Sequence, residues 1–305
     1  MLNFCGAGET LLCKELLPII KELLAEGHYC MIVTNGTITP KFNEMAEWPD
    51  ELKEHLFIKF SYHFLELKRL KLTSKFFDNV RKMKENGISF TVEVTPSDEY
   101  IPYIEEIKEE CMREIGALPH ITVCRIENGN VPLMSKLPKE EFIKTWETFD
   151  SELFNFKIDI FGEERKEFCY AGAWSYTLQL VDGTLRQCYR GRKLQNIFED
   201  VNAPIKEIPI GCNCLDAHCW NGHAFLAFGD IPEMKTPTFE KERNRKTENG
   251  DWVTKKMADF MSTKLSESNN TLDDKQQKKF NKKSKQFRDF QGIKHKIKKV
   301  VKGNE

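Results

Sequence analysis

The first 126 residues alternate between short apolar runs and amphipathic stretches, and this alternation constrains the fold more than any other feature. The apolar runs have the length and composition of strands and start near Leu2, Tyr29, Phe57, Ile88 and Ile121. Between them, apolar residues recur at helical spacing, as from Leu11 to Glu26, and Ser74 is placed to cap a helix ending at Asn86-Gly87. The pattern predicts an α/β fold with parallel strands and right-handed crossovers, in an open sheet or a barrel.

Small and polar residues follow several of these runs, where parallel α/β folds gather their ligands. They are Cys5, Gly6, Gly8, Glu9, Thr34, Asn35, Ser61 and Glu93. The pair Gly6 and Gly8 could cradle a phosphate, but Leu11 stands where a dinucleotide fingerprint needs its third glycine. A tight strand-to-helix turn is the alternative. The carboxylate of Glu9 suits a cationic ligand such as an amine better than a phosphate.

Five of the ten cysteines fall within one short stretch of the chain. Thirteen residues separate Cys169 from Gly183, and four separate Gly183 from Cys188. A second group contains Cys212, Cys214 and Cys219. Sulfurs from two separated loops are the ligands that zinc or an iron–sulfur cluster needs. A hairpin over residues 177–185, turning on Asp182-Gly183, is predicted between the first two cysteines.

The cysteine content and the start of the chain bear on the compartment. Residues 1–6 have neither a basic nor an apolar signal region, and no apolar run approaches the length of a membrane span. Ten cysteines in such a chain favour the reducing cytoplasm and metal binding over disulfides. Three further cysteines, Cys30, Cys111 and Cys124, lie on apolar faces and are expected to be core thiols.

Charge is distributed unevenly along the chain. Between Lys275 and Lys302 there are twelve Lys/Arg against one acid, Asp289, whereas residues 1–274 carry 34 Lys/Arg against 45 Asp/Glu. The acidic body argues against a nucleic-acid-binding core, and no nucleic-acid partner is expected. The tail is predicted to be a basic, weakly amphipathic helix that touches anionic lipid or nucleic acid, or else is solvated or docks a partner.

Two motifs resemble those of the radical S-adenosylmethionine (radical SAM) enzymes. Gly6-Ala7-Gly8-Glu9, after a strand and before a helix, resembles their Gly-Gly-Glu motif. The element Cys169-x13-Gly183-x4-Cys188 is similar to the hallmark of the SPASM/Twitch extension. The resemblance covers roughly residues 1–230. It implies a partial (β/α)6 TIM-like barrel lacking its first strand over 1–126, a small cysteine-rich α+β SPASM/Twitch extension over 127–234, and a polar, basic helical tail over 235–305.

The resemblance also implies roles for individual residues. Gly6, Gly8 and Glu9 would contact the methionyl group of S-adenosylmethionine. Asn35 and Ser61 would lie near this group or the ribose, and Glu93 would face cofactor or substrate, with core or turn roles left open for all three. The auxiliary [4Fe-4S] cluster would be held by Cys169, Cys188, Cys214 and Cys219, with Cys212 as a spare or substitute ligand. A structural zinc site on the same cysteines, with His218 and His223 nearby, is the alternative; His223 itself is expected to be a hydrogen-bonded packing residue.

The CxxxCxxC motif that holds the catalytic [4Fe-4S] cluster of these enzymes is absent, so no catalytic residue is assigned. We expect an N-terminally truncated product or a mis-called start that omits roughly 30 residues or more, and a scaffold that has lost its catalytic cluster is the alternative. The resemblance implies that an intact version would cleave S-adenosylmethionine to a radical that modifies a peptide, protein or sugar, with electrons from a donor such as flavodoxin or ferredoxin. The competing hypothesis is a non-catalytic zinc- or iron–sulfur-binding α/β scaffold.

Overall fold

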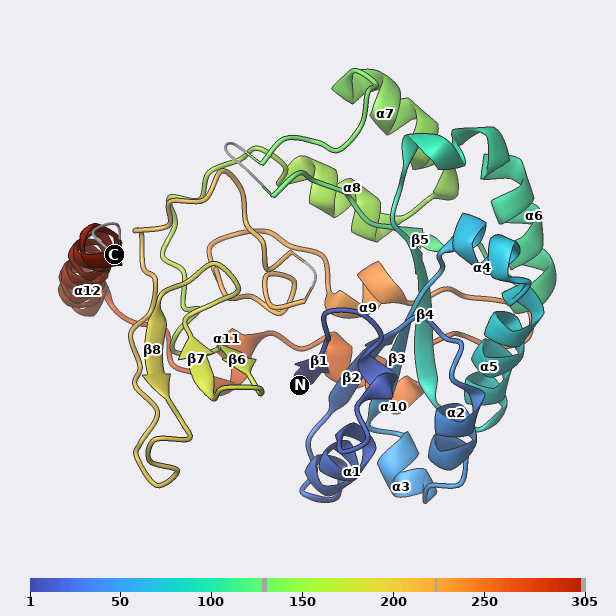
Figure 1. Cartoon of the computed structure of the whole chain (residues 1–305), viewed down its shortest axis with the longest axis horizontal. Helices are drawn as coiled ribbons and strands as arrows, with labels where there is room; N and C mark the ends of the chain where they lie inside the picture. Colours follow the sequence, from blue (N-terminus) through green and yellow to red (C-terminus); the bar gives the residue numbers. More distant parts are fainter. Residues whose placement is uncertain (128–130, 223, 303–305) are drawn as a thin grey trace. The chain divides into compact units, whose positions relative to one another are not determined.

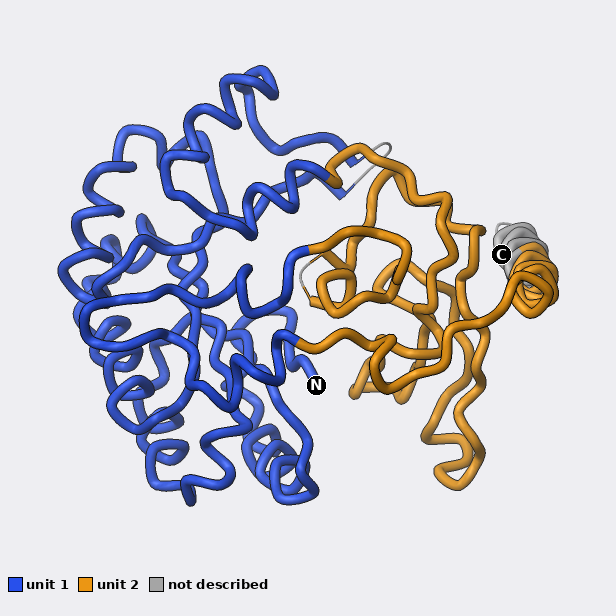
Figure 2. The backbone as a smooth tube through the Cα atoms, turned by 180° about the vertical axis from the view of Figure 1, so that it is seen from behind, with its two compact units in different colours: residues 1–159, 237–262 blue, residues 160–236, 263–305 orange. Residues whose placement is uncertain are grey.

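The computed structural model describes residues 1–127, 131–222 and 224–302, and the chain forms two compact units (Figure 1). Unit 1 comprises Met1–Asp159 and Pro237–Ser262, and unit 2 comprises residues 160–236 and the chain from Thr263 onward. Figure 2 draws unit 1 in blue and unit 2 in orange. Each unit therefore combines two separate stretches of sequence. Their bounds differ from the expected domains at 1–126, 127–234 and 235–305, and that division stays a prediction.

A parallel five-stranded sheet forms the centre of unit 1, as the alternation predicts. Its strands are β1 (Leu2–Phe4), β2 (Cys30–Thr34), β3 (Leu56–Ser61), β4 (Ser89–Val94) and β5 (His120–Ile121). They lie side by side in the order of the sequence, from β1 to β5. Thr34 pairs with Phe60, and Ser61 pairs with Glu93. The carboxyl ends of β2, β3 and β4 therefore meet at one edge of the sheet.

Two helices, α2 (Thr39–Ala46) and α5 (Thr73–Glu85), pack on the sheet face that carries Phe60; Figure 1 shows where these helices lie. The ring of Phe60 lies 5.5 Å from Phe42 and 5.7 Å from Phe76, which belong to the covering helices. The helical elements of residues 1–159 are η1 (Thr10–Leu12), α1 (Leu16–Ala25), α2 (Thr39–Ala46), α3 (Asp50–Lys53), α4 (Phe64–Leu70), α5 (Thr73–Glu85), η2 (Asp98–Tyr103), α6 (Ile104–Ile115), α7 (Lys139–Trp146), η3 (Glu147–Phe149) and α8 (Glu152–Asp159). Because strand side chains alternate between faces, Lys59 and Ser61 lie on the opposite face.

The second stretch of unit 1 contains α9 (Phe239–Arg243) and α10 (Lys255–Met261) and contacts the sheet at two places. The ring of Phe239 contacts Phe57 edge-on, with 6.3 Å between centroids. The backbone oxygen of Trp252 accepts a hydrogen bond from the amide of Phe90 at 3.0 Å, and its ring stacks on that of Phe90. The stretch therefore pairs with the part of β4 that the short β5 leaves open.

The start of the first helix differs from the prediction. The single helix expected from Leu11 to Glu26 is divided into η1 and α1, which begins at Leu16. The carboxylate of Glu9 accepts a hydrogen bond from the amide of Leu11 at 2.9 Å, and the same oxygen binds the Thr34 hydroxyl. The break itself lies at Cys13, whose extended backbone (ψ 121°) ends η1 before α1 begins.

Two further predictions need correction. Ser74 does not cap α5, because the helix begins at Thr73 with Leu72 at the capping position, and the Ser74 hydroxyl donates to Asp78 instead. The strand expected over 121–126 pairs with β4 only as far as Ile121, since β4 ends at Val94, and Arg125 instead forms an isolated antiparallel bridge with Leu133.

Unit 2 contains little regular structure around a small antiparallel sheet. Its strands are β6 (Thr177–Gln179), β7 (Thr184–Arg186) and β8 (Lys193–Asn196). The hairpin predicted between Cys169 and Cys188 is confirmed by the pairing of β6 with β7. Gly183 has φ +71°, and a Cβ there would lie 2.6 Å from both Asn196 Oδ1 and the Phe198 ring. The spacing motif therefore has a structural reason for its glycine.

Two helices follow in unit 2, α11 (Leu265–Ser268) and α12 (Asp274–Lys302), so the predicted basic helix is confirmed. Asn281 Oδ1 accepts a hydrogen bond from the amide of Cys212 at 2.7 Å, and the Ser284 hydroxyl donates to the Ile210 oxygen at 2.8 Å. These bonds attach α12 to the cysteine-bearing segment. Within the described residues, no helix combines the length and apolar character needed to cross a membrane.

Candidate cofactor and metal sites

The carboxylate of Glu9 joins the ends of β1 and β2. Its Oε1 accepts hydrogen bonds from the Leu11 amide (2.9 Å) and the Thr34 hydroxyl (2.7 Å), and its Oε2 accepts one from the Asn35 amide (2.6 Å). Because a carboxylate oxygen accepts two hydrogen bonds, Oε2 retains capacity for a further donor. The structure thus brings together two predicted site residues, Glu9 and Asn35, and fixes the carboxylate in place.

The two glycines of the motif form a turn with an open side. Gly8 has φ +99°, which side chains rarely adopt, and no atom lies within 4 Å of where its Cβ would be. The amide of Gly6 donates to the Thr10 hydroxyl at 3.0 Å. The helix that follows, η1, has only three residues. This geometry matches the tight-turn interpretation of the glycines better than a phosphate cradle.

His63 also lies at this edge, although no sequence motif marks it. Its Nε2 lies 3.1 Å from Asn35 Oδ1. Burial, together with the charge of Lys59, lowers the pKa of His63. His63 follows β3 by two residues, so the rule that ligands gather at strand ends could have identified it. Ser61, also predicted, is half-buried at the end of β3 beside Glu93.

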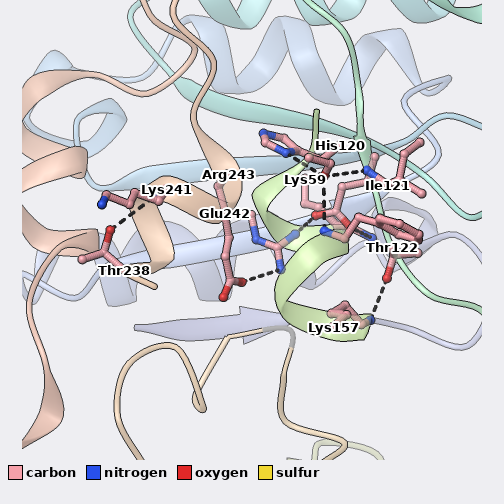
Figure 3. A network of polar contacts seen from close by, with 12 residues as sticks. Lys59, His120, Ile121, Thr122, Lys157, Thr238, Lys241, Glu242 and Arg243 are labelled. Atoms are coloured by element: carbon pink, nitrogen blue, oxygen red, sulfur yellow. Dashed lines mark hydrogen bonds and ion pairs between the residues drawn. The ribbon is translucent and has the colours of Figure 1, made fainter. Parts of the chain in front are cut away.

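Glu93 lies among cations on the face of the sheet that carries Lys59 and Ser61. Its carboxylate pairs with Lys59 at 3.0 Å and with Arg243 of α9. Arg243 also approaches Glu242 at 4.0 Å, and Lys157 of α8 donates to the Thr122 hydroxyl at 2.6 Å (Figure 3). Burial alone raises the pKa of Glu93, but Arg243 and Lys59 outweigh it, so the pKa is lowered overall. Glu93 is thus an anion inside an ion network.

The four cysteines predicted as ligands line a single pocket in unit 2. They are Cys169, Cys188, Cys214 and Cys219. The pocket is a cavity of about 30 Å³. The Cys169 backbone pairs with Gly211 through two hydrogen bonds, at 3.2 and 2.9 Å, so the segment of the first cysteine lies against that of the second group. Cys169 and Cys219, which are 50 residues apart in the sequence, therefore line the same pocket, as expected of ligands from two separated loops.

The thiols of this pocket resist ionisation. Burial raises the pKa of Cys169 and Cys219 well above that of a free thiol, raises that of Cys188 to about 12, and also raises that of Cys214. Neighbouring thiols and acids add to the shift, since each thiolate would repel the next. A bound cation reverses this balance because it stabilises the thiolate directly.

These donors fit a four-thiolate centre in number and chemistry. In the part of the chain that the structure describes, no three His, Cys, Asp or Glu side chains already form a group that could hold a metal ion. A metal would therefore have to draw the sulfurs together. Cys212 is exposed and does not line the pocket.

Of the other cysteines, Cys30 and Cys111 are buried as predicted, whereas Cys124 is only half-buried. His218 lines the thiol pocket and stacks on Phe161. His223, predicted to be a packing residue, lies outside the described residues.

Several residues of the thiol pocket were not selected from the sequence. Arg165, Arg190 and Asp230 line it. The Asp230 carboxylate accepts from the Ser175 hydroxyl at 2.7 Å, and burial raises the pKa of Asp230 to about 7. Arg190 lies over the Trp220 ring and pairs with Asp216 at 3.3 Å. The two arginines place positive charge where thiolates would form. No spacing motif marks them, because they reach the pocket from separate loops.

No protein-family model matches the chain, and no curated protein matches it in sequence.

Proposed function

We propose that the chain binds S-adenosylmethionine at the carboxyl edge of the unit 1 sheet and holds an iron–sulfur centre on Cys169, Cys188, Cys214 and Cys219 of unit 2. These are the properties of a radical SAM protein with a Twitch-like extension. The observation that carries the proposal is the convergence of the four cysteines on one pocket. Its substrate would be a peptide, protein or sugar, and its electrons would come from a donor such as flavodoxin or ferredoxin.

The strand order supports a partial barrel. A doubly wound sheet reverses its strand order at a switch point, whereas a (β/α) barrel adds each strand beside the previous one. The sheet here runs from β1 to β5 without reversal. The predicted ligand residues lie at the carboxyl ends of its strands, where such barrels bind their ligands.

The residues of unit 1 would bind and orient the cofactor. Glu9 Oε2 would accept a hydrogen bond from the methionyl ammonium, and the bonds to Thr34 and Asn35 keep that oxygen in position. The open side of the Gly8 turn leaves room for a ligand beside it. Bound S-adenosylmethionine would supply the reactive group, and an iron–sulfur centre one-electron chemistry.

The residues of unit 2 would bind and tune the centre. The four thiols would lose their protons on binding, and Arg165 and Arg190 would offset part of the negative charge that results. Burial of Cys169 would limit access of water to its sulfur. These residues would anchor the centre and set its electrostatics.

The second candidate function is a zinc-binding scaffold without catalytic activity. The position of His218 on the wall of the same pocket favours it, because zinc accepts mixed cysteine and histidine ligands. Both candidates use the same cysteines. They differ in the metal and in whether unit 1 binds S-adenosylmethionine.

Calorimetric titration with S-adenosylmethionine tests the first candidate. We expect saturable binding by the whole chain that weakens about tenfold or more in Glu9→Gln, since the charge-assisted bond to the ammonium is lost. The matched control is Glu22→Gln, an exposed glutamate of α1, which should bind as the wild type does. Absence of binding by the wild-type chain would refute the cofactor assignment and favour the scaffold.

A further inference from the structure

The end of the small sheet in unit 2 exposes apolar side chains that the proposed function does not use. Val181 lies at the turn between β6 and β7 and is 91% exposed, and Phe198, which follows β8, is 54% exposed. The two segments touch, because a Cβ at Gly183 would lie 2.6 Å from the Phe198 ring. We name this surface, residues 180–183 and 196–202, the hairpin tip.

The hairpin tip is acidic as well as apolar. Its acids are Asp182, Glu199 and Asp200, and it contains no Lys or Arg. These three residues are exposed, and so is Val201, at 78%. Apolar side chains that are exposed together and bordered by charge mark surfaces that bind another macromolecule. A partner for the hairpin tip should therefore carry positive charge together with apolar groups.

Helix α12 carries a surface with those properties. Residues 275–285 contain six lysines and no acid: Lys275, Lys278, Lys279, Lys282, Lys283 and Lys285. All six are exposed, and at 3.6 residues per turn they lie on the side of the helix away from the buried Ser284. Their four-carbon stems supply apolar surface, and their ammonium groups supply charge. We name these six residues the lysine face.

The hairpin tip and the lysine face of one chain do not cover each other. The hydrogen bonds of Asn281 and Ser284 attach α12 to the backbone of residues 210–212. Figure 1 shows α12 apart from the end of β8, where the tip begins. Both surfaces are therefore open to a second copy of the chain. Their charges are complementary, because the tip carries three carboxylates and the lysine face six ammonium groups.

We propose that the hairpin tip of one copy binds the lysine face of a second copy. Carboxylates of the tip pair with lysine ammonium groups, and the side chains of Val181 and Phe198 lie along the lysine stems. Two copies related by a two-fold axis make this contact twice, because each copy offers both surfaces. The contact requires neither the metal centre nor S-adenosylmethionine, so it goes beyond the proposed function and stands or falls separately.

Sedimentation equilibrium of the whole chain tests the contact. The protein is kept reduced, so that the exposed Cys212 forms no cross-link between copies. We expect a mass of two chains, with a dissociation constant that rises about tenfold or more between roughly 0.1 M and 1 M KCl, since the Debye length falls from about 10 Å to about 3 Å. A chain that is monomeric at every concentration, or a dimer that salt leaves unchanged, would overturn the proposal.

An exchange of charge between the two surfaces tests whether they meet. The tip variant is Glu199→Lys with Asp200→Lys. The helix variant replaces four lysines by glutamate: Lys278→Glu, Lys279→Glu, Lys282→Glu and Lys283→Glu. Each variant alone should be monomeric, because like charges then face each other across the contact. An equal mixture of the two variants should form a heterodimer, since every contact again joins opposite charges.

The control changes the net charge by the same amount as the helix variant. It carries four exposed substitutions in unit 1, outside both surfaces: Lys21→Glu, Lys75→Glu, Lys139→Glu and Lys144→Glu. This control should associate as the wild type does. Loss of the dimer in the control as well would show that net charge alone governs association, and would overturn the proposal.

A further variant covers the case in which the tip variant does not fold. Asp200 accepts a hydrogen bond from the Asn202 amide at 3.0 Å, which the tip variant removes. Val181→Asp leaves that bond in place, adds a charge at the most exposed apolar position of the tip, and should also weaken association. Tip and helix variants that dimerise as the wild type does, or a mixture of them that stays monomeric, would overturn the proposal.

Discussion

The carboxyl edge of unit 1 and the thiol pocket of unit 2 are organised in opposite ways. In unit 1 the polar groups already have opposite partners: Glu9 accepts three hydrogen bonds, and Glu93 pairs with Lys59 and Arg243. In unit 2 the gathered groups are alike, four thiols whose ionisation burial and mutual repulsion oppose. The first region is stabilised by the chain itself, whereas the second needs a cation to become stable in its ionised form.

This contrast separates two uses of burial. Burying opposite charges together fixes their geometry and makes the loss of one partner costly. Burying like groups together leaves a site that only a ligand satisfies, so ligand binding and folding become coupled. The predictions below test each half of the comparison, beginning with the largest expected effect.

Removal of one pocket thiol should abolish the metal centre. We expect Cys219→Ser to lose stoichiometric metal and Cys212→Ser to retain it, because Cys219 lines the pocket and Cys212 does not. Metal content per chain after anaerobic purification gives the answer. Equal metal content in the two variants would contradict the assignment of the ligands.

Removal of one partner from the ion network should destabilise unit 1. We expect Arg243→Ala to lower the free energy of unfolding by about 3–5 kcal/mol, since it leaves the carboxylate of Glu93 buried with less compensation. Urea unfolding measures the change. Arg69→Ala, which removes an exposed pair with Glu66, is the control and should have little effect. A small effect of Arg243→Ala would mean that Lys59 alone balances Glu93.

A side chain at Gly183 should disturb unit 2 without removing a ligand. We expect Gly183→Ala to cost roughly 1–3 kcal/mol, because φ is +71° and the Cβ would approach Asn196 and Phe198. Hydrogen exchange of the hairpin amides reports the change. Gly162→Ala has a positive φ but no atom within 4 Å of its Cβ, so it separates backbone strain from crowding. If the two variants exchange alike, crowding at Gly183 contributes nothing.

Acid should weaken unit 1 through His120. Burial and the nearby cations Arg245 and Arg243 place the pKa of His120 well below its usual value. The unfolded chain therefore binds more protons than the folded chain below about pH 6.5, and stability should fall there by up to ~1.4 kcal/mol per pH unit. The stability that comes from keeping His120 neutral is fully present above about pH 6.5. Unfolding free energies of wild type and His120→Gln between pH 5 and 8 test this, and parallel curves would exclude His120 as the cause.

Much of unit 1 could be predicted from the sequence because local pattern determines it. The strand–helix alternation and the strand-end rule identified the sheet edge with Glu9 and Asn35. They could not reveal that the Glu9 carboxylate would bond to the Thr34 hydroxyl, since Thr34 lies on another strand. Arg243 was missed for the same reason: it reaches Glu93 across 150 residues of sequence.

In unit 2 the Asp182-Gly183 turn predicted the hairpin, and the resemblance to the SPASM/Twitch extension implied the set of pocket cysteines. Neither could predict that Arg165, Arg190 and Asp230 would surround them. Those residues come from irregular loops, whose course depends on packing and leaves no periodic signal in the sequence.

The central claim is that the four pocket cysteines form one metal centre. Its most direct test is the quantification of iron, acid-labile sulfide and zinc in the wild-type chain purified without oxygen, together with its visible absorption. We predict about four irons and four sulfides per chain with visible charge-transfer absorption, as a [4Fe-4S] centre requires. Stoichiometric zinc without sulfide would contradict the iron–sulfur assignment, and a chain free of all three would contradict the metal centre itself.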